Sequence, residues 1–304
     1  MAAGGKDSAR IGVAVSGGPD SLALLLLMQE CFSGRVFAAT IDHQLRPEAA
    51  AEAQLVAQIC AQRSIPHAIL TPPAPITGNL QSAARAARYA LLEQWADANQ
   101  CAYIATAHHA DDQLETILMR LARGSGVDGL SGVRTVNGRI IRPLLAFAKS
   151  ELSEICLGAG VAAVQDPSNL DLDFDRVRMR EWLAASPGPL NPDAAVRSAA
   201  ALADASEALV WMTDRLAVDR IAQNAAEITL NPAELPHELL RRLLVTALAL
   251  LQPETSHRGA AIDRGITSLL AGQTITLGNV LCKGGSVWHF TPAPPRSQGK
   301  RSGD

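Results

Sequence analysis

The chain has 304 residues, 48% of them hydrophobic and 19% charged, which is the composition of a globular protein of about two domains. A chain of this length buries enough apolar surface for a core without disulfides or metal ions, and its modest charge excludes disorder over most of its length. The net charge of −3 excludes a uniformly basic surface for nucleic acids.

The first half of the chain alternates between strand-like and helix-like segments. Apolar runs predict strands at residues 10–15, 36–41, 67–70 and 102–106. Helical spacing of apolar residues predicts helices that end near residue 31 and that cover 48–63, 79–99 and 111–123. This order predicts an α/β fold, with a parallel sheet covered by helices on both faces. Ligands bind such sheets beyond the carboxyl ends of the strands, where Ser16, Asp42 and Thr106 follow.

The second half of the chain is less regular. The Asn137-Gly138 pair predicts a hairpin, and a proline-rich linker follows at 186–192. Between them we expect a helix at 149–157, a strand at 161–164 and a turn at 166–169. After the linker we expect helices at 194–224, 235–251 and 259–271 and short β-like segments at 274–277, 280–282 and 287–290. The predicted domains are 1–188 and a smaller, mostly helical 189–292, with a disordered tail at 293–304.

Cysteine spacing and the length of apolar runs indicate the compartment. The five cysteines form no CxxC pair, which excludes a zinc knuckle or a thioredoxin-like redox pair. Their odd number and the lack of an export signal favour a reducing cytoplasm. The most apolar run, residues 22–28, is far shorter than the roughly 20 residues that a spanning helix needs. We therefore expect a cytoplasmic protein with no membrane partner.

One stretch of the chain is locally basic. Asp128 is the single acidic residue among six basic ones: Arg120, Arg123, Arg134, Arg139, Arg142 and Lys149. Such a stripe is compatible with binding a polyanion at one place, and equally with an ordinary solvated surface.

The strongest motif is a glycine-rich turn between the first predicted strand and helix. Its residues are Ser16, Gly17, Gly18, Pro19, Asp20 and Ser21. Glycines let the backbone approach an anion, and the N–H groups at a helix start offer it the positive end of the helix dipole. The turn lacks the lysine and the spacing of a Walker loop. It predicts a phosphate site; the alternative is a turn in which Ser and Asp merely cap the helix.

A second motif is the segment from Thr106 to Thr116. Asp112 and Glu115 are three residues apart, so they share one face of the predicted helix at its first turn. Two carboxylates there could hold Mg²⁺ or the ammonium group of a substrate, or could simply complement the helix dipole. His108 is either a phosphate contact or a polar loop residue.

These motifs occur among others that together resemble the tRNA(Ile)-lysidine synthetases, also called synthases. The matching segments are SGGPDS from Ser16, IDHQLRPEA from Ile41, NLQSAARAARY from Asn79, TAHHADDQLET from Thr106, LARGSGVDGLSG from Leu121, IRPLL from Ile141 and DPSNLDLDFDRVRMR from Asp166. SGGxDS alone marks only the pyrophosphate-loop superfamily; the segments from Leu121 and Asp166 are more specific. The chain departs from the family at Gln44, where Gly or Asn is usual, and at Val177, where Asn is usual.

The resemblance implies a fold and an activity. The fold is a Rossmann-like, adenine-nucleotide alpha-hydrolase-like domain with a pyrophosphate loop, followed by a helical appendage that binds tRNA. The family attaches L-lysine to carbon 2 of the wobble cytidine of the isoleucine tRNA with anticodon CAU. ATP is cleaved to AMP and pyrophosphate, because adenylation of the cytosine oxygen creates a leaving group that the ε-amine of lysine can displace.

The resemblance also implies residue roles in the reaction. ATP would be bound by Asp42, His43, His108 and the loop from Ser16 to Ser21, and the catalytic residues would be Asp20, Arg88, Asp112, Glu115 and Arg180. Asp20 and Asp112 would hold Mg²⁺. Without the resemblance, Arg85 and Arg88 could be ordinary solvated helix arginines, and His43 a packed loop histidine.

The tRNA contacts that the resemblance implies are Arg123, Arg134, Arg139, Arg176 and Arg178, because arginine suits phosphate geometry. The Arg176 cluster could also be a solvated helix face. The rival functions are a tRNA thiolase on the same scaffold, which generally needs cysteine pairs that this chain lacks, and a non-catalytic nucleotide- or tRNA-binding protein. The oligomeric state stays open, with a homodimer as one expectation.

Overall fold

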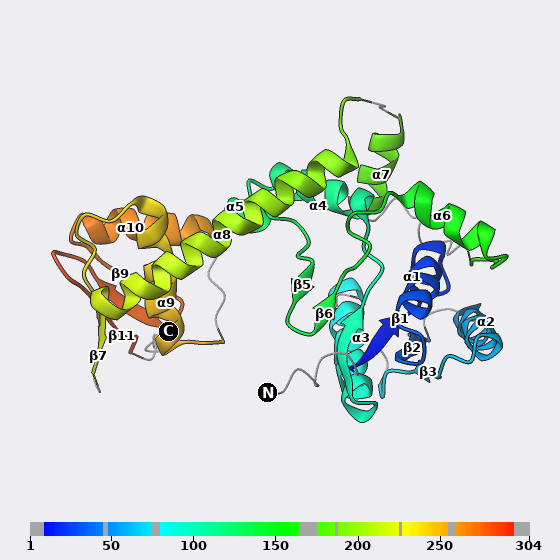
Figure 1. Cartoon of the computed structure of the whole chain (residues 1–304). Coiled ribbons are helices and arrows are strands. Elements are labelled where there is room, and N and C mark those ends of the chain that lie inside the picture. Colours follow the sequence, from blue (N-terminus) through cyan, green and yellow to red (C-terminus); the bar gives the residue numbers. More distant parts are fainter. Residues whose placement is uncertain are drawn as a thin grey trace, which may run out of the picture. The chain divides into compact units, whose positions relative to one another are not determined.

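The computed structural model describes residues 9–44, 48–74, 80–164, 175–185, 188–224, 227–254 and 259–294. The chain divides into two compact units, Met1–Ala203 and Asp204–Asp304 (Figure 1). The domain boundaries expected above stay a prediction. The expected turn at 166–169 and residues 295–304 of the expected tail lie outside the described residues. Within the described part, no helix is long and apolar enough to cross a membrane.

The first unit is built on a mostly parallel sheet of six strands in the order β3-β2-β1-β4-β6-β5, in which β5 alone runs antiparallel to its neighbour. The strands are β1 (Arg10–Ala14), β2 (Val36–Ile41), β3 (His67–Leu70), β4 (Cys101–Ala105), β5 (Val136–Asn137) and β6 (Ile140–Ile141). The predicted parallel α/β fold and the hairpin are therefore confirmed. The strand expected at 161–164 is wrong, because the N–H of Val164 donates to the carbonyl oxygen of Gly17 (2.9 Å) instead of joining the sheet.

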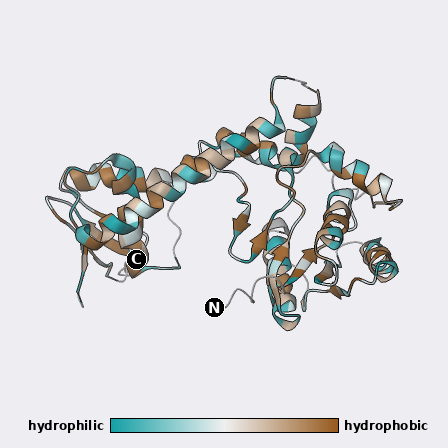
Figure 2. Ribbon diagram, viewed as in Figure 1, coloured by the Kyte–Doolittle hydropathy of each residue, from teal (hydrophilic) through white to brown (hydrophobic). Residues whose placement is uncertain are grey.

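Helices cover both faces of this sheet. They are α1 (Pro19–Cys31), α2 (Glu48–Gln62), α3 (Leu80–Ala98), α4 (Ala110–Ala122), α5 (Val127–Leu130), α6 (Lys149–Gly158) and α7 (Asp175–Ala185). One buried cluster joins the strands to α1, α2 and α6, with Leu22, Val56 and Leu152 among its members. A second buried cluster joins the other face to α3 through Leu92 and Trp95. The hydrophobic colour of β1 in Figure 2 reflects this burial on both faces.

A close approach between α3 and β1 depends on a glycine. A Cβ atom on Gly12 would lie 2.6 Å from a ring carbon of Trp95. The indole therefore packs directly on the backbone of β1, which continues into the glycine-rich turn. This packing fixes the strand from which the predicted phosphate site begins.

The second unit contains helices and an antiparallel sheet of five strands in the order β7-β8-β11-β10-β9. Its elements are the end of α8 (Pro192–Arg220), β7 (Ile221–Gln223), β8 (Ile228–Leu230), α9 (His237–Leu251), α10 (Gly259–Leu270), β9 (Thr274–Leu277), β10 (Val280–Lys283) and β11 (Trp288–Pro292). Trp288 and Phe290 are fully buried among leucines of α9. The expected helices and terminal strands are confirmed. The helix expected up to residue 224 ends at Arg220, because the next residues pair with β8.

Candidate active site

The glycine-rich turn joins β1 to α1 and is held by its two serines. The hydroxyl of Ser21 accepts the N–H of Ser16 (3.0 Å), donates to the carbonyl oxygen of Gly18 (3.0 Å) and lies 3.1 Å from the hydroxyl of Ser16. Gly17 has a φ of +88°, which favours glycine. No side chain caps α1 at Gly18. The first N–H groups of the helix are therefore not capped by a side chain at Gly18 and can serve an anion site.

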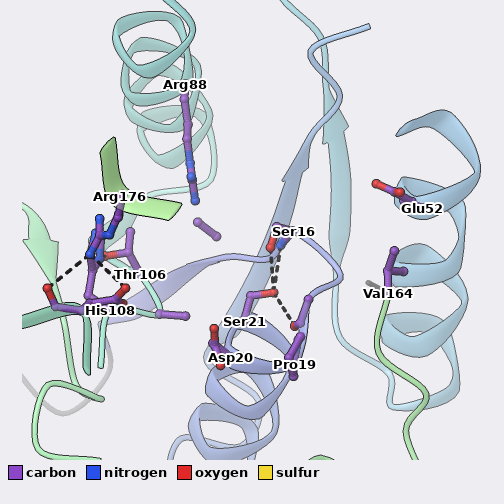
Figure 3. A pocket seen from close by; sticks show the side chains of 14 residues that line it. Ser16, Pro19, Asp20, Ser21, Glu52, Arg88, Thr106, His108, Val164 and Arg176 are labelled. Carbon is purple, nitrogen blue, oxygen red and sulfur yellow. Dashed lines mark hydrogen bonds and ion pairs between the residues drawn. The ribbon is translucent and has the colours of Figure 1, made fainter. Parts of the chain in front are cut away.

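A cavity of about 350 Å³ opens at the carboxyl edge of the sheet beside this turn. It brings together residues predicted from separate parts of the sequence: Ser16, Gly18, Pro19, Asp20, Ser21, Arg88, His108, Asp112 and Arg176. In Figure 3, Arg88 reaches down from α3, Arg176 and His108 lie on one side of the turn, and Glu52 and Val164 lie on the other. No motif in the sequence indicated that Glu52 and Val164 would form a wall of this cavity.

His108 is a neutral group in a basic environment. Its Nδ1 lies 3.2 Å from the hydroxyl of Thr106. Burial and the nearby guanidinium groups, those of Arg142, Arg176 and Arg88 foremost, lower the pKa of His108 to about 3. Burial also lowers the pKa of Arg88, but a guanidinium stays charged in proteins. The cavity thus combines cationic groups with an uncharged imidazole, a suitable surrounding for phosphate oxygens.

His109 is a site residue that sequence reasoning missed. Its ring is buried, and it lies 3.5 Å from the carboxylate of Asp20, 3.4 Å from that of Asp111 and 3.5 Å from that of Asp112. Burial lowers the pKa of His109, but interactions with Asp111 and Asp20 outweigh burial and raise it to about 9. The imidazolium therefore holds three carboxylates together. The available signal was a histidine directly before a helix with two aspartates in its first turn.

Glu115 lies behind the cavity and is paired with two arginines of α7. Oε2 of Glu115 accepts from Nε of Arg176 (2.8 Å), and Oε1 accepts from Nε of Arg180 (2.9 Å). Arg176 also donates to Oδ1 of Asp112 (2.9 Å). Burial raises the pKa of Glu115, but the hydrogen bonds from Arg180 and Arg176 lower it below its usual value overall. Arg176, expected on a tRNA-binding surface, thus lies in the cavity, while Val177 beside it is buried.

A second cavity, also of about 350 Å³, adjoins the first. The two cavities share Pro19, Asp20, Asp112 and Arg176. Arg180 and Lys149 line only the second cavity. The predicted catalytic residues Asp20, Asp112 and Arg180 therefore lie around one space, together with a lysine that the sequence analysis had counted only as part of the basic stripe.

Asp42 and His43 follow β2, and neither belongs to the described residues that line the two cavities. Oδ1 of Asp42 accepts the N–H of Gln44 (2.8 Å). Gln44 has a φ of +55°, in the left-handed region that Gly and Asn adopt most readily. The Gly or Asn that the resemblance leads us to expect at this position would adopt this conformation readily. Burial, and after it the charge of Arg88, lowers the pKa of His43, although Asp42 acts in the opposite direction.

The arginines expected to bind tRNA are in different environments. Arg123 and Arg178 both pair with the carboxylate of Asp175, Arg123 at 2.7 Å, and more than half of each side chain is exposed. The side chain of Arg139 instead donates to the carbonyl oxygen of Cys101 and pairs with Asp97. Cys101 begins β4, so Arg139 lies at the sheet edge opposite the cavities.

The rest of the basic stripe is partly used inside the protein. Arg120 donates to the carbonyl oxygens of Gly129 (2.5 Å) and Gly132 (2.9 Å), and Arg142 donates to that of Arg134 (2.6 Å). These bonds hold the loop after α4. Arg120 and Arg142 thus have a structural role inside the protein. The stripe had been interpreted as a polyanion site or as a solvated surface, and neither interpretation anticipated this role.

Comparison with known proteins identifies the family. Residues 2–186 match the PP-loop domain family. The tRNA(Ile)-lysidine synthase of Zymomonas mobilis subsp. mobilis is 45% identical, over 96% of this chain and 91% of its own. That of Novosphingobium aromaticivorans is 41% identical, over 97% and 92%.

A solved structure supports the fold. The U34-tRNA thiolase NcsA of Methanococcus maripaludis, solved with its [4Fe-4S] cluster, superposes with a TM-score of 0.54 at 18% identity, over 65% of this chain and 73% of that one. At this low identity, the likeness to the thiolase concerns the fold. In the described part of this chain, there is no group of three or more His, Cys, Asp and Glu side chains that could hold a metal ion, and the cysteines are free. With the domain match and the relatives that are similar over nearly their whole length, the chain belongs to the tRNA(Ile)-lysidine synthase family of ATP-dependent, PP-loop ligases.

Proposed function

We propose that this protein ligates L-lysine to carbon 2 of the wobble cytidine in the isoleucine tRNA with anticodon CAU. ATP would supply the adenylate of the intermediate, with release of pyrophosphate and then AMP. One observation carries the proposal: the glycine-rich turn, Arg88 and the carboxylate of Asp112 line a single cavity. This arrangement supports a nucleotide site with an acidic site for the amine next to it.

The turn and α3 divide the work on the nucleotide. The open amino end of α1 and the hydroxyls of the turn suit the departing pyrophosphate. Arg88, which points into the cavity from α3, offsets the charge that develops on the α-phosphate (Figure 3). Neutral His108 adds a polar contact without adding charge. Asp42 and His43, at the end of β2, would lie toward the adenine.

The donor set also suits Mg²⁺. Oδ1 of Asp20 is buried and has no hydrogen-bond partner among the described residues, and the carboxylates of Asp20 and Asp112 both lie 3.5 Å from Nε2 of His109. Mg²⁺ in nucleotide enzymes is commonly held by one or two carboxylates together with phosphate oxygens. Asp20 and Asp112 are the residues that would hold the ion. When bound, it would neutralise charge on the triphosphate.

Two substitutions complete the proposed reaction. In the first, the cytosine oxygen attacks the α-phosphorus of ATP, and pyrophosphate leaves. In the second, the ε-amine of lysine attacks carbon 2, and AMP leaves with that oxygen. The amine must first lose a proton. The side chain of Asp112 is 14% exposed and that of Glu115 only 3%, so Asp112 is the better placed acceptor. Glu115 would instead position Arg176 and Arg180.

The exposed pair Arg123 and Arg178 would bind phosphates of the anticodon stem. We further propose that the second unit contributes contacts outside the anticodon. The initiator methionine tRNA also has a CAU anticodon, so the anticodon alone cannot select the substrate.

Product analysis tests the proposed function. The purified protein is incubated with ATP, lysine and CAU-anticodon isoleucine tRNA, and the tRNA is digested to nucleosides for mass spectrometry. The expected product is cytidine joined to lysine with loss of water, absent from initiator methionine tRNA. Sulfur incorporation would support the thiolase alternative instead. ATP binding without any change in the tRNA would support a non-catalytic protein.

A further inference from the structure

The second cavity has an uneven distribution of charge. Asp20, Asp112 and Arg176 lie in the wall that it shares with the nucleotide cavity, and Arg180 and Lys149 line the part that belongs to the second cavity alone. The side adjacent to the nucleotide thus holds two carboxylates and one arginine that is already paired with Asp112 and Glu115, whereas the charged residues of the other side are both cations. A ligand with an ammonium group at one end and a carboxylate at the other fits this polarity.

The cationic groups of this cavity are not equally available. Arg180 donates two hydrogen bonds to Glu115, and Arg176 is shared between Glu115 and Asp112. The side chain of Lys149 is exposed and has no ion pair within the described part of the chain. Among the described residues that line this cavity, Lys149 is therefore the cation whose charge is not already matched by a carboxylate.

The fold fixes Lys149 relative to Asp112. Lys149 is the first residue of α6, and its backbone N–H donates to Oδ2 of Asp111 (2.9 Å). The N–H of Ala110 donates to the carbonyl oxygen of Phe147 (2.9 Å). These two bonds tie the start of α6 to the start of α4, the turn that carries Asp112. These bonds fix the backbone from which the side chain of Lys149 extends relative to the helical turn that carries Asp112.

We propose that Lys149 binds the α-carboxylate of the amino-acid substrate and thereby selects an amino acid over a simple diamine. This inference rests on the proposed function. The reacting ε-amine must face the nucleotide cavity, where the adenylated base forms, so it lies toward Asp112. The α-carboxylate then points away from the nucleotide, toward the part of the cavity that Lys149 lines. An ammonium-to-carboxylate hydrogen bond there distinguishes lysine from amines of the same length.

The test compares lysine with 1,5-diaminopentane, which has the same amine-bearing chain and no carboxylate. Each is measured as a substrate of the full protein with ATP and tRNA, and diaminopentane also as a competitive inhibitor of lysine. In Lys149→Met, we expect kcat/KM for lysine to fall about 10- to 100-fold, mainly through KM, as for loss of a charged hydrogen bond. The constants for diaminopentane and the KM for ATP should not change. Lys149→Arg should restore most of the activity on lysine.

The controls separate this inference from its foundation. Lys283→Met removes an exposed lysine of the second unit and should leave the kinetic constants for both amines unchanged. If Lys149→Met lowers kcat/KM equally for lysine and diaminopentane, Lys149 does not bind the carboxylate. The same conclusion follows if kcat/KM changes for neither amine. If the wild-type protein releases no AMP in response to lysine, the proposed function itself is wrong.

Discussion

Nε of Arg176 donates a hydrogen bond to Oε2 of Glu115 across 2.8 Å, and this bond connects α7 to α4 behind the nucleotide cavity. The same guanidinium group reaches Oδ1 of Asp112 at 2.9 Å. A single arginine thus links the buried carboxylate to the more accessible one. Changes at Glu115 should therefore act on the amine site through Arg176.

Glu115→Gln tests this connection. The amide keeps a hydrogen-bond acceptor but removes the charge that matches Arg176 and Arg180. We expect the free energy of unfolding to fall by about 1 to 3 kcal/mol, and the KM for lysine to rise more than the KM for ATP. Urea unfolding and steady-state kinetics measure the two effects. If lysine saturation is unchanged in both Glu115→Gln and Asp112→Asn, those carboxylates are only structural.

His108 should make the free energy of unfolding decrease at acidic pH. Its pKa is lowered to about 3 in the folded protein, mainly by burial and Arg142, from an ordinary value of 6.5. The unfolded chain therefore binds an extra proton between these values. The contribution of His108 is fully present above about pH 6.5 and is lost as the pH falls toward 3. We compare the free energy of unfolding in urea at pH 7.5 and at pH 5.0. The decrease between these two pH values should be about 1 to 2 kcal/mol smaller for His108→Gln than for the wild type. Equal losses would contradict the lowered pKa.

Asp175 should compete with RNA phosphates. Its carboxylate pairs with Arg123 and Arg178 on an exposed surface. Asp175→Asn removes this competitor, so tRNA should bind roughly 2- to 5-fold more tightly at low salt, the scale of an exposed ion pair. Arg123→Ala should weaken binding and flatten the log–log salt dependence by about 0.7 to 0.9. Filter binding over a salt series measures both. Unchanged affinity in both variants would place the tRNA elsewhere.

Arg139 offers a matched comparison for Arg123. Both are basic-stripe arginines for which the family resemblance implies tRNA contact. The guanidinium group of Arg139, however, binds the Cys101 carbonyl and pairs with Asp97 at the opposite sheet edge. Arg139→Ala should lower the midpoint of thermal unfolding and leave the salt slope of tRNA binding unchanged. A flatter slope without loss of stability would restore Arg139 as a tRNA contact.

The parts of the fold and site that could be predicted depend on local signals. The turn from Ser16 to Ser21 follows from its glycines and from the strand and helix around it. The carboxylate pair follows from helical spacing. Arg176 forms a hydrogen bond with Glu115, which is 61 positions away in the sequence. The periodicity of the sequence cannot predict a contact between residues so far apart. The environment of His109 depends equally on Asp20, which belongs to a different element. The strand expected at 161–164 failed because Val164 bonds to the turn, a tertiary contact that overrides its β-type composition.

In the proposed reaction, the protein adenylates its tRNA before lysine enters. The direct measurement incubates the protein with CAU-anticodon isoleucine tRNA and ATP labelled in the α-phosphate, without lysine, followed by addition of lysine. We expect label on the tRNA before the addition and labelled AMP after it, with neither in Asp20→Ala, which should still fold. Label that never reaches the tRNA would exclude the adenylated intermediate, and near-normal activity of Asp20→Ala would exclude the ATP site proposed at the glycine-rich turn.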